Sequence, residues 1–247
     1  GLRVAALNFK EEPNPLLARE VDAFETVSLG ELGKQLRFFK AHGVRRAVMQ
    51  GQVHHTQLYN QKIKIDLRAA WLLTKHKLLV GNMRTEAIVG SLVKELGSHG
   101  VHIEPATWLM EPWLASAGHQ AGPKPGAEVR RDIAFGVRLT RELNRLDIGQ
   151  TVVVKRQSCV AVESAEGTDA CILRAGKLGK EGCVVVKLAR PKQDLRFDLP
   201  VVGLKTFKML AKVRAAALVL EAGKTLFLDK EACLAVAAQA KMSVLTA

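Results

Sequence analysis

The chain has 247 residues, enough for one large domain or two ordinary domains that each bury a core. With 48% apolar and 25% charged residues it has the profile of a soluble globular protein, and its longest apolar runs are too short to cross a bilayer. The net charge of +13 favours anionic partners, although a plain solubility role also fits, and 5% aromatic residues leave little material for base stacking.

Short apolar runs alternate with longer segments of helical period, which predicts an α/β fold. The expected strands are Leu2–Asn8, Arg45–Gln50, Val152–Arg156, Cys159–Glu163, Cys183–Ala189, Ala217–Glu221, Thr225–Leu228 and Ser243–Leu245. The expected helices are Leu29–Ala41, Asp66–Lys77, Thr85–Ser98, Glu128–Arg145, Thr168–Lys180, Leu204–Arg214 and Lys230–Lys241.

A concentration of Gly and Pro in Ser116–Ala127 predicts the linker between two α/β domains, residues 1–120 and 121–247. Their sheets are expected to be largely parallel or mixed. The second domain carries most of the charge: residues 124–247 hold 22 Lys/Arg against 13 Asp/Glu. Four cysteines without a Cys-x-x-Cys pair indicate reduced thiols, not a zinc site or a disulfide framework.

The first polar stretch of the second domain is Glu163–Ala170, which mixes carboxylates with helix-start signals. Thr168 is a good N-cap, and Gly167 lets the backbone approach closely where the helix begins. Unpaired amides at such a helix start can hold a phosphate. Capping by Thr168 and Asp169 alone is the commoner role.

The second polar stretch is Lys192–Pro200, followed by Gly203. On a strand, Asp194, Arg196 and Asp198 would share one face and place acid, cation and acid in a row. A solvated strand edge explains such a row, and so does a site for a divalent cation and phosphate oxygens. Two such stretches in one basic domain favour the functional interpretation.

Two other features have ordinary structural explanations. Gly149 follows the Glu128–Arg145 helix and suits a helix stop. The Leu204 helix has lysines on one side and apolar residues such as Phe207 on another, which is typical of an amphipathic surface helix. Contact of that helix with an anionic membrane is the weaker alternative.

Together these residues resemble the UDP-2,3-diacylglucosamine pyrophosphatases of lipid A biosynthesis, of the kind unrelated to metallophosphoesterases. The resemblance covers most of the second domain and more loosely Val44–Val53 and Gly81–Gly100. The matching motifs, in chain order, are Leu146–Gln150, Ala161–Glu163, Glu166–Ala170, Arg174–Gly176 and Gln193–Pro200 with Gly203.

The resemblance implies hydrolysis of the diphosphate of UDP-2,3-diacylglucosamine to UMP and 2,3-diacylglucosamine 1-phosphate (lipid X), with the substrate held between two α/β domains. It implies a Mg²⁺ or Mn²⁺ cofactor, a cytoplasmic enzyme of a Gram-negative bacterium, and transient peripheral contact with the inner membrane. It ties the acid of the Asp-x-Pro segment, here Asp198, most firmly to catalysis. The sequence does not indicate the number of subunits.

Read with that chemistry, the residues predict catalytic roles for Asp198, Asp194 and Asp169, with Asp198 as a metal ligand. The predicted substrate-binding residues are Glu166, Gly167, Thr168, Arg174, Lys192, Gln193 and Arg196.

The chain departs from the family at two places. It lacks the opening strand and glycine-rich turn, so we expect upstream residues to be missing. Where many members have Gly-Asp-Asp, this chain has Gly81-Asn82-Met83. The loss of two carboxylates there supports an alternative, a weakened or inactive member that binds a glycolipid or nucleotide sugar. A basic nucleic-acid-binding module is a further alternative, but the acid-bearing loops and few aromatics argue against it.

Overall fold

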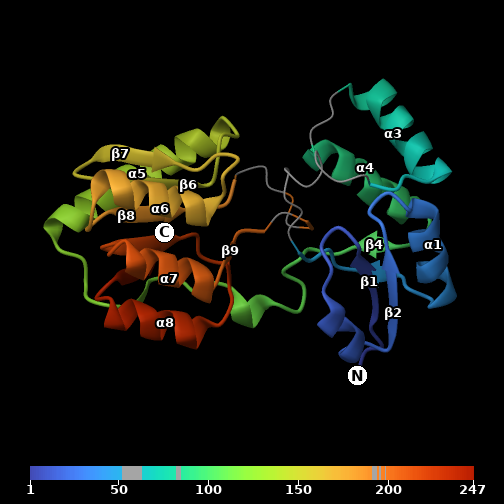
Figure 1. The fold of residues 1–247 in the computed structure, drawn as a ribbon, viewed down its shortest axis with the longest axis horizontal. Helices are drawn as coiled ribbons and strands as arrows, with labels where there is room; N and C mark the ends of the chain where they lie inside the picture. Colours follow the sequence, from blue (N-terminus) through green and yellow to red (C-terminus); the bar gives the residue numbers. More distant parts are fainter. Residues whose placement is uncertain (52–62, 82–84, 191–193, 195, 198) are drawn as a thin grey trace. The chain divides into compact units, whose positions relative to one another are not determined.

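The chain folds into two compact α/β units (Figure 1). The computed structural model describes residues 1–51, 63–81, 85–190, 194, 196–197 and 199–247. The units are Gly1–Ala106 and Thr107–Ala247, and both combine helices with parallel strands, which confirms the predicted fold class. The expected boundary at residue 120 falls within β5 (His119–Ala121), a strand of the second unit's sheet.

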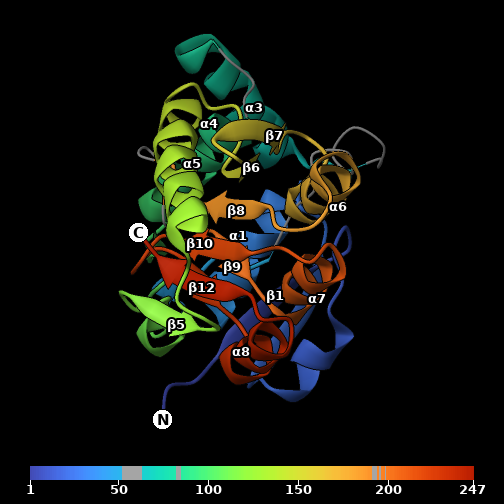
Figure 2. The ribbon, with the colours of Figure 1, turned by 90° about the vertical axis from the view of Figure 1, so that its left-hand side faces the viewer.

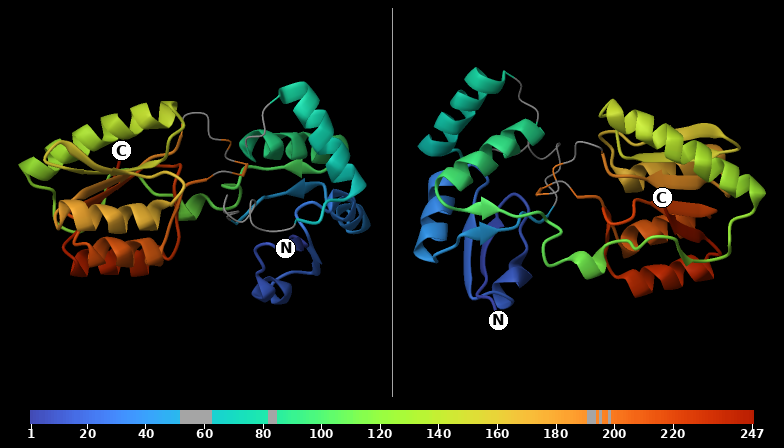
Figure 3. Two further views of the ribbon diagram at one scale, coloured as in Figure 1. Left: turned by 45° about the horizontal axis from the view of Figure 1, so that its top comes forward. Right: turned by 180° about the vertical axis from the view of Figure 1, so that it is seen from behind.

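The first unit contains two small parallel strand pairs and a helical layer (Figure 3). Its strand pairs are β1 (Ala5–Phe9) with β2 (Ala23–Val27) and β3 (Arg46–Ala47) with β4 (His102–Ile103). Its helices are the 3₁₀ helix η1 (Pro15–Arg19) and the α-helices α1 (Leu32–Ala41), α3 (Leu67–Val80) and α4 (Thr85–Ser98). The helix α3 packs against both α1 and α4 around a buried leucine cluster.

Asp66 joins two of these helices at their starts. One carboxylate oxygen accepts a hydrogen bond from the Ala69 amide at 2.9 Å and so caps α3. The other oxygen accepts from the Gly33 amide in α1 at 2.7 Å. A single side chain therefore satisfies first-turn amides of both helices, which otherwise lack intrahelical partners.

The second unit is a three-layer α/β domain around a six-stranded sheet. The sheet order is β5-β12-β10-β8-β6-β7. Its strands after β5 are β6 (Thr151–Lys155), β7 (Ser158–Val162), β8 (Val184–Lys187), β10 (Ala217–Leu220) and β12 (Ser243–Thr246). A separate parallel pair is formed by β9 (Val201–Val202) and β11 (Leu226–Phe227). The helices are η2 (Glu111–Trp113), α5 (Ala127–Arg145), α6 (Thr168–Gly179), α7 (Leu204–Lys212) and α8 (Lys230–Gln239).

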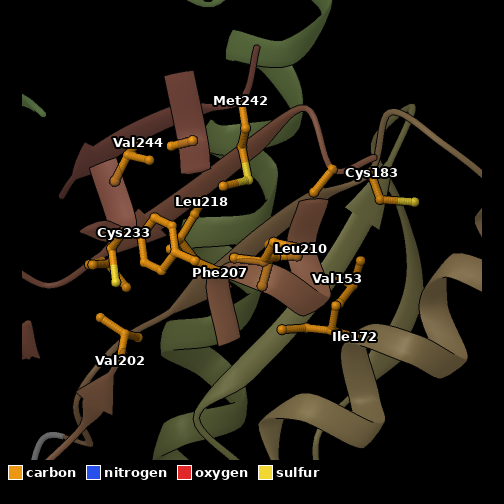
Figure 4. Packing of buried hydrophobic residues seen from close by; sticks show 14 of the residues in the cluster. Val153, Ile172, Cys183, Val202, Phe207, Leu210, Leu218, Cys233, Met242 and Val244 are labelled. Atoms are coloured by element: carbon orange, nitrogen blue, oxygen red, sulfur yellow. The ribbon is translucent and has the colours of Figure 1, made fainter. Parts of the chain in front are cut away.

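Helices cover both faces of this sheet. Figure 2 shows α5 on one side of β8, β10 and β12, and α6, α7 and α8 on the other. The larger core lies on the three-helix side, and Figure 4 shows part of it, including Phe207 of α7. Phe207 stacks on Phe227 with ring centroids 5.3 Å apart. A smaller core beneath α5 contains Val152, Val184 and Val186. The apolar face of α7 is thus buried and its lysines are exposed, as expected for an amphipathic surface helix.

Strand direction determines where polar loops gather. The strands β8, β10 and β12 are parallel, β6 is antiparallel to β8, and β7 is antiparallel to β6. The carboxyl ends of β7, β8, β10 and β12 and the amino end of β6 therefore lie at one edge of the sheet. Ligands of α/β proteins commonly bind at this edge.

The turn between β6 and β7 depends on a buried carboxylate of α5. Arg156 and Gln157 have φ values of 49° and 54°, as in two-residue hairpin turns, although neither is Gly or Asn. Asp132, 3% exposed, accepts hydrogen bonds from the amides of Arg156 at 2.9 Å and Gln157 at 2.6 Å. These bonds offset the backbone strain of the turn.

The prediction that Gly149 stops α5 is wrong. The helix ends at Arg145, and the residue with left-handed backbone is Asp147, at φ 57°. Gly149 instead permits a close approach of two strands, because a Cβ there would lie 1.9 Å from the carbonyl oxygen of Glu163. It therefore sets the contact between the start of β6 and the end of β7.

The four cysteines are free thiols, as predicted. Cys171 in α6 is fully buried, and burial raises its pKa to about 12. In the part of the chain that the structure describes, no helix is both long enough and apolar enough to pass through a membrane.

Candidate functional site

Polar side chains collect at the carboxyl edge of the second unit's sheet, on the side covered by α6. Lys187 is the last residue of β8 and lies opposite Thr151, the first residue of β6, in the strand register. Glu163 follows β7, and its amide donates to the Thr151 carbonyl at 2.9 Å. The ends of three strands thus place Thr151, Glu163 and Lys187 side by side.

Thr168 connects the two charged groups at this edge. The Lys187 ammonium donates to the Thr168 hydroxyl at 2.7 Å, and that hydroxyl donates to Oε1 of Glu163 at 2.9 Å. Lys187 is only 4% exposed and Glu163 only 7%. The second oxygen of Glu163, Oε2, is buried and has no hydrogen-bond partner among the described residues. The buried Lys187 ammonium and the buried Glu163 carboxylate therefore both bind the Thr168 hydroxyl, and Oε2 of Glu163 has no donor.

The expected N-cap role of Thr168 is wrong. The N-cap of α6 is Gly167, at φ 82°, and no side chain caps the helix. Thr168 is instead the first residue of the helix, and its hydroxyl binds Glu163 and Lys187 as part of the polar cluster. The first-turn amides of α6 have no intrahelical partners, so the helix start keeps the amide donors that sequence reasoning expected there.

Glu166 and Arg174 fasten the loop before α6. Arg174 donates to Oε1 of Glu166 at 2.5 Å and to the Val162 carbonyl at 2.8 Å. Glu166 Oε2 accepts from the Ser164 amide at 3.0 Å. The hydrogen bond from Arg174 lowers the pKa of Glu166. Glu166 and Arg174, both predicted to bind the substrate, therefore also stabilise the conformation of the loop between β7 and α6.

Asp169 links the start of α6 to the start of α7. Its carboxylate accepts from the Thr206 hydroxyl at 2.9 Å and pairs with the Lys205 ammonium at 3.1 Å. The connection between β8 and α7 contains the second polar stretch. The last residue of β8, Lys187, binds Thr168, and Thr206 in the first turn of α7 binds Asp169. The two elements that flank the connection are therefore both bound to the first two residues of α6.

Within the connection, Asp194 and Arg196 bind each other. The Arg196 guanidinium donates to both carboxylate oxygens, at 2.9 Å to Oδ1 and 2.6 Å to Oδ2, and its amide donates to Oδ1 at 3.1 Å. The side-chain hydrogen bonds from Arg196 hold the pKa of Asp194 below its usual range. The proposed acid and the proposed phosphate ligand therefore form one bidentate pair.

Three predicted site residues, Lys192, Gln193 and Asp198, lie outside the described residues. The same holds for Asn82 and Met83.

The structure adds two residues to which the sequence assigned no role, Lys187 and Glu163. Lys187 is the last residue of the otherwise apolar strand β8 (Val184–Lys187), and a cation at the carboxyl end of such a strand is the signal that identifies its position. Glu163 directly follows β7, the edge strand on the other side of β6.

The described residues do not form a metal site by themselves. No group of three or more His, Cys, Asp or Glu side chains among them is arranged to hold a metal ion. Of the predicted acids, Asp194 is bound by Arg196, and Asp169 by Thr206 and Lys205.

Comparison with known proteins gives consistent matches over both units. The LpxI N-terminal domain model matches residues 1–113, and the LpxI C-terminal domain model matches residues 116–245. The chain is 29% identical over 245 residues to "UDP-2,3-diacylglucosamine pyrophosphatase LpxI" of Caulobacter vibrioides, a match that covers 96% of this chain and 86% of that protein.

The Asp194–Arg196 pair predicts a specific pH effect. Because the folded pKa of Asp194 is lowered, the pair stabilises the folded chain above the ordinary carboxyl range, and this is lost as the pH falls through the lowered pKa. Arg196→Gln should raise the pKa of Asp194, measured by NMR titration of its carboxyl carbon. Arg214→Gln, which removes the exposed pair with Glu181, should leave that titration unchanged. An unaltered Asp194 titration in Arg196→Gln would contradict the assignment.

Proposed function

The chain belongs to the LpxI family, and from this membership we propose that it hydrolyses the diphosphate of UDP-2,3-diacylglucosamine to UMP and 2,3-diacylglucosamine 1-phosphate, a step of lipid A biosynthesis. The observation that carries the proposal is the match of both units, over 96% of the chain, to a relative named for that pyrophosphatase activity. The polar edge beside α6 supports it with a suitable set of donors.

Hydrolysis of a phosphoanhydride requires neutralisation of charge on two phosphates and a water molecule placed in line with the bond that breaks. At the edge of the sheet, the buried Lys187 ammonium lies beside the open amides of the α6 start. A cation and a helix N-terminus together stabilise negative charge that develops on phosphate oxygens. We propose that the diphosphate binds beside Thr168, near the Lys187 ammonium and the first amides of α6.

The connection from β8 to α7 completes the proposed site. We assign Asp198 the orientation of the attacking water, with Asp194 and Asp169 positioning the groups around it. Arg174, Arg196, Lys192 and Gln193 would bind phosphate oxygens. Ion pairing does not exclude this role for the two arginines, because a guanidinium has five N–H donors and each pair uses only some of them. Glu166 would then hold Arg174 in place.

We also propose a requirement for Mg²⁺ or Mn²⁺, which would neutralise charge on the diphosphate. This rests on the family resemblance and on Asp198. Since the described residues do not form the metal site by themselves, no step of the mechanism is assigned to the ion.

The proposal predicts that the purified chain releases UMP from UDP-2,3-diacylglucosamine when Mg²⁺ is present. Asp198→Ala should lower turnover by roughly 10³-fold or more while circular dichroism and thermal unfolding stay unchanged. Release of UMP is measured by chromatography with equimolar lipid phosphate as a check. Binding of the substrate without UMP release in the unmodified chain would favour the alternative of an inactive binding protein, which Asn82 and Met83 support.

The Thr168 hydroxyl can be tested with two substitutions. Thr168→Val keeps the side-chain shape but separates Lys187 from Glu163, so kcat should fall roughly 10²- to 10³-fold. Thr168→Ser retains the hydroxyl and should stay within about tenfold of the unmodified chain. Equal activity of the valine and serine variants would show that the hydroxyl has no role in the reaction.

Because the proposed substrate is a membrane lipid, we propose peripheral contact with the cytoplasmic face of the inner membrane, made by α3. This helix exposes Leu67 (90%), Trp71 (55%) and Leu78 (80%) at spacings that align them on one face. It contains no acidic residue, and the Lys75 ammonium lies 4.7 Å from the Trp71 ring centroid. An apolar stripe with basic neighbours fits an anionic bilayer surface.

Vesicle binding tests this contact. The double variant Trp71→Ser/Leu78→Ser should lower the partition coefficient on vesicles rich in phosphatidylglycerol roughly tenfold or more. The matched control is Leu146→Ser/Leu178→Ser, which removes two exposed leucines of the second unit. Co-sedimentation gives the bound fraction. Equal losses in both double variants, or equal binding to neutral phosphatidylcholine vesicles, would contradict a specific role of α3.

A further inference from the structure

The three residues that follow Lys187, Leu188 to Arg190, are held by side chains from the end of α5, from the turn after it and from the residue after β10. They lie at the carboxyl end of β8, just before the second polar stretch, Lys192–Pro200. The Leu188 amide still continues the sheet ladder, because it donates to the Gln150 carbonyl at 3.0 Å. Beyond that bond, side chains hold the backbone.

Ala189 is held from two directions. Its amide donates to Oε2 of Glu221 at 2.9 Å, and its carbonyl accepts from Nδ2 of Asn144 at 3.1 Å. The same amide group of Asn144 also donates to the Leu188 carbonyl at 3.2 Å. Asn144 belongs to the last turn of α5 and is 5% exposed, and Glu221 directly follows β10. The backbone at this point is therefore joined to both α5 and β10.

Arg190 is held by Asp147 in the turn after α5. Its guanidinium donates to Oδ1 of Asp147 at 2.7 Å. Buried backbone groups need hydrogen bonds, which is a sufficient reason for the contacts of Asn144 and Glu221. That reason does not extend to Arg190 and Asp147, whose side chains are 27% and 41% exposed. Asp147 also has a φ of 57°, which glycine adopts at lower cost, so the turn gives no reason for an aspartate, whereas the contact with Arg190 does.

These contacts lie on the opposite face of the sheet from Thr168. Successive residues of a strand point to opposite faces. Lys187 binds Thr168 on the α6 side, and the next residue, Leu188, packs in the core beneath α5. The chain is therefore held on both faces where it leaves β8. The downstream end of the connection to α7 is held as well, because the Pro200 carbonyl accepts from the Leu226 amide at 2.8 Å.

We propose that Asn144, Asp147 and Glu221 are positioning residues for the hydrolysis, an inference that rests on the proposed function. They hold the backbone from which the second polar stretch begins, and so direct its phosphate-binding and water-orienting groups to the diphosphate. A misplacement of about 1 Å at a reacting group can lower a rate roughly 10²-fold. Because none of the three residues touches the substrate in this assignment, their loss should lower kcat more than it changes KM.

Asp147 gives the sharpest test, because its loss should separate activity from stability. Asp147→Gly removes the carboxylate that holds Arg190 and relieves the left-handed backbone, so the unfolding temperature should stay equal or rise. The kcat for UMP release should nevertheless fall roughly tenfold or more, with KM changed less than about threefold. Asp147→Asn keeps an acceptor for Arg190 and tolerates the same backbone, so kcat should stay within about threefold of the unmodified chain.

The matched control is Lys241→Gly, which relieves another left-handed residue, at φ 51° after α8, and should leave kcat within about twofold. UMP release is followed by chromatography and unfolding by circular dichroism. An unchanged kcat in Asp147→Gly, or an equal fall in Lys241→Gly, would overturn the positioning role and leave the hydrolysis intact. Failure of the unmodified chain to release UMP would instead overturn the proposed function and, with it, the role of these residues.

Glu221 provides an independent check of the same inference. Glu221→Leu removes the acceptor of the Ala189 amide, so that amide should exchange its hydrogen faster and kcat should fall roughly tenfold or more. Glu221→Gln keeps an acceptor and should preserve both the protection of Ala189 and the rate. Glu181→Leu, which removes the exposed pair with Arg214, is the control and should change neither. Faster exchange at Ala189 with an unchanged kcat would show a purely structural contact and contradict the inference.

Discussion

The buried ammonium group of Lys187 is the constraint around which the second unit's polar edge is arranged. A charge removed from water is tolerated only when hydrogen bonds replace its hydration. The Thr168 hydroxyl accepts one of these hydrogen bonds from Lys187 and donates another to Glu163. The hydrogen bonds among Lys187, Thr168 and Glu163 therefore fix the ends of β7 and β8 and the start of α6 relative to one another. The sheet, and not only the loops, positions the hydrogen-bond donors at this edge.

Most of the fold could be predicted because local sequence patterns determine its larger elements. Each predicted helix and strand is present, because α5 and α7 have strong apolar periodicity and β8 and β10 are continuous apolar runs. The misses are short strands or strands with polar residues. Ala23–Val27 contains Glu25 and Thr26, and only its long-range pairing with β1 makes it a strand. Such pairing has no local signature in the sequence.

For the candidate site, the sequence indicates which stretches are polar but not which of their residues contact one another. Polarity alone identified the two stretches, and in the structure Asp169 binds Thr206 and so connects α6 with α7, the helix that follows the second stretch. The partner choices follow from tertiary structure. Thr168 was expected to cap a helix, but the nearby buried Lys187 and Glu163 compete for its hydroxyl, and Gly167 takes the N-cap position at no steric cost. Arg196 could equally have faced solvent; in the fold it is closed on Asp194.

The turn held by Asp132 makes the β6–β7 hairpin dependent on a helix that is distant in sequence. Arg156 and Gln157 adopt a backbone conformation that costs energy for L-residues, and a carboxylate 24 and 25 residues upstream offsets that cost. The hairpin has no glycine or asparagine with which to close independently. The closed turn of this hairpin consequently depends on α5, and loosening of that helix would remove the hydrogen bonds that hold the turn residues in their strained conformation.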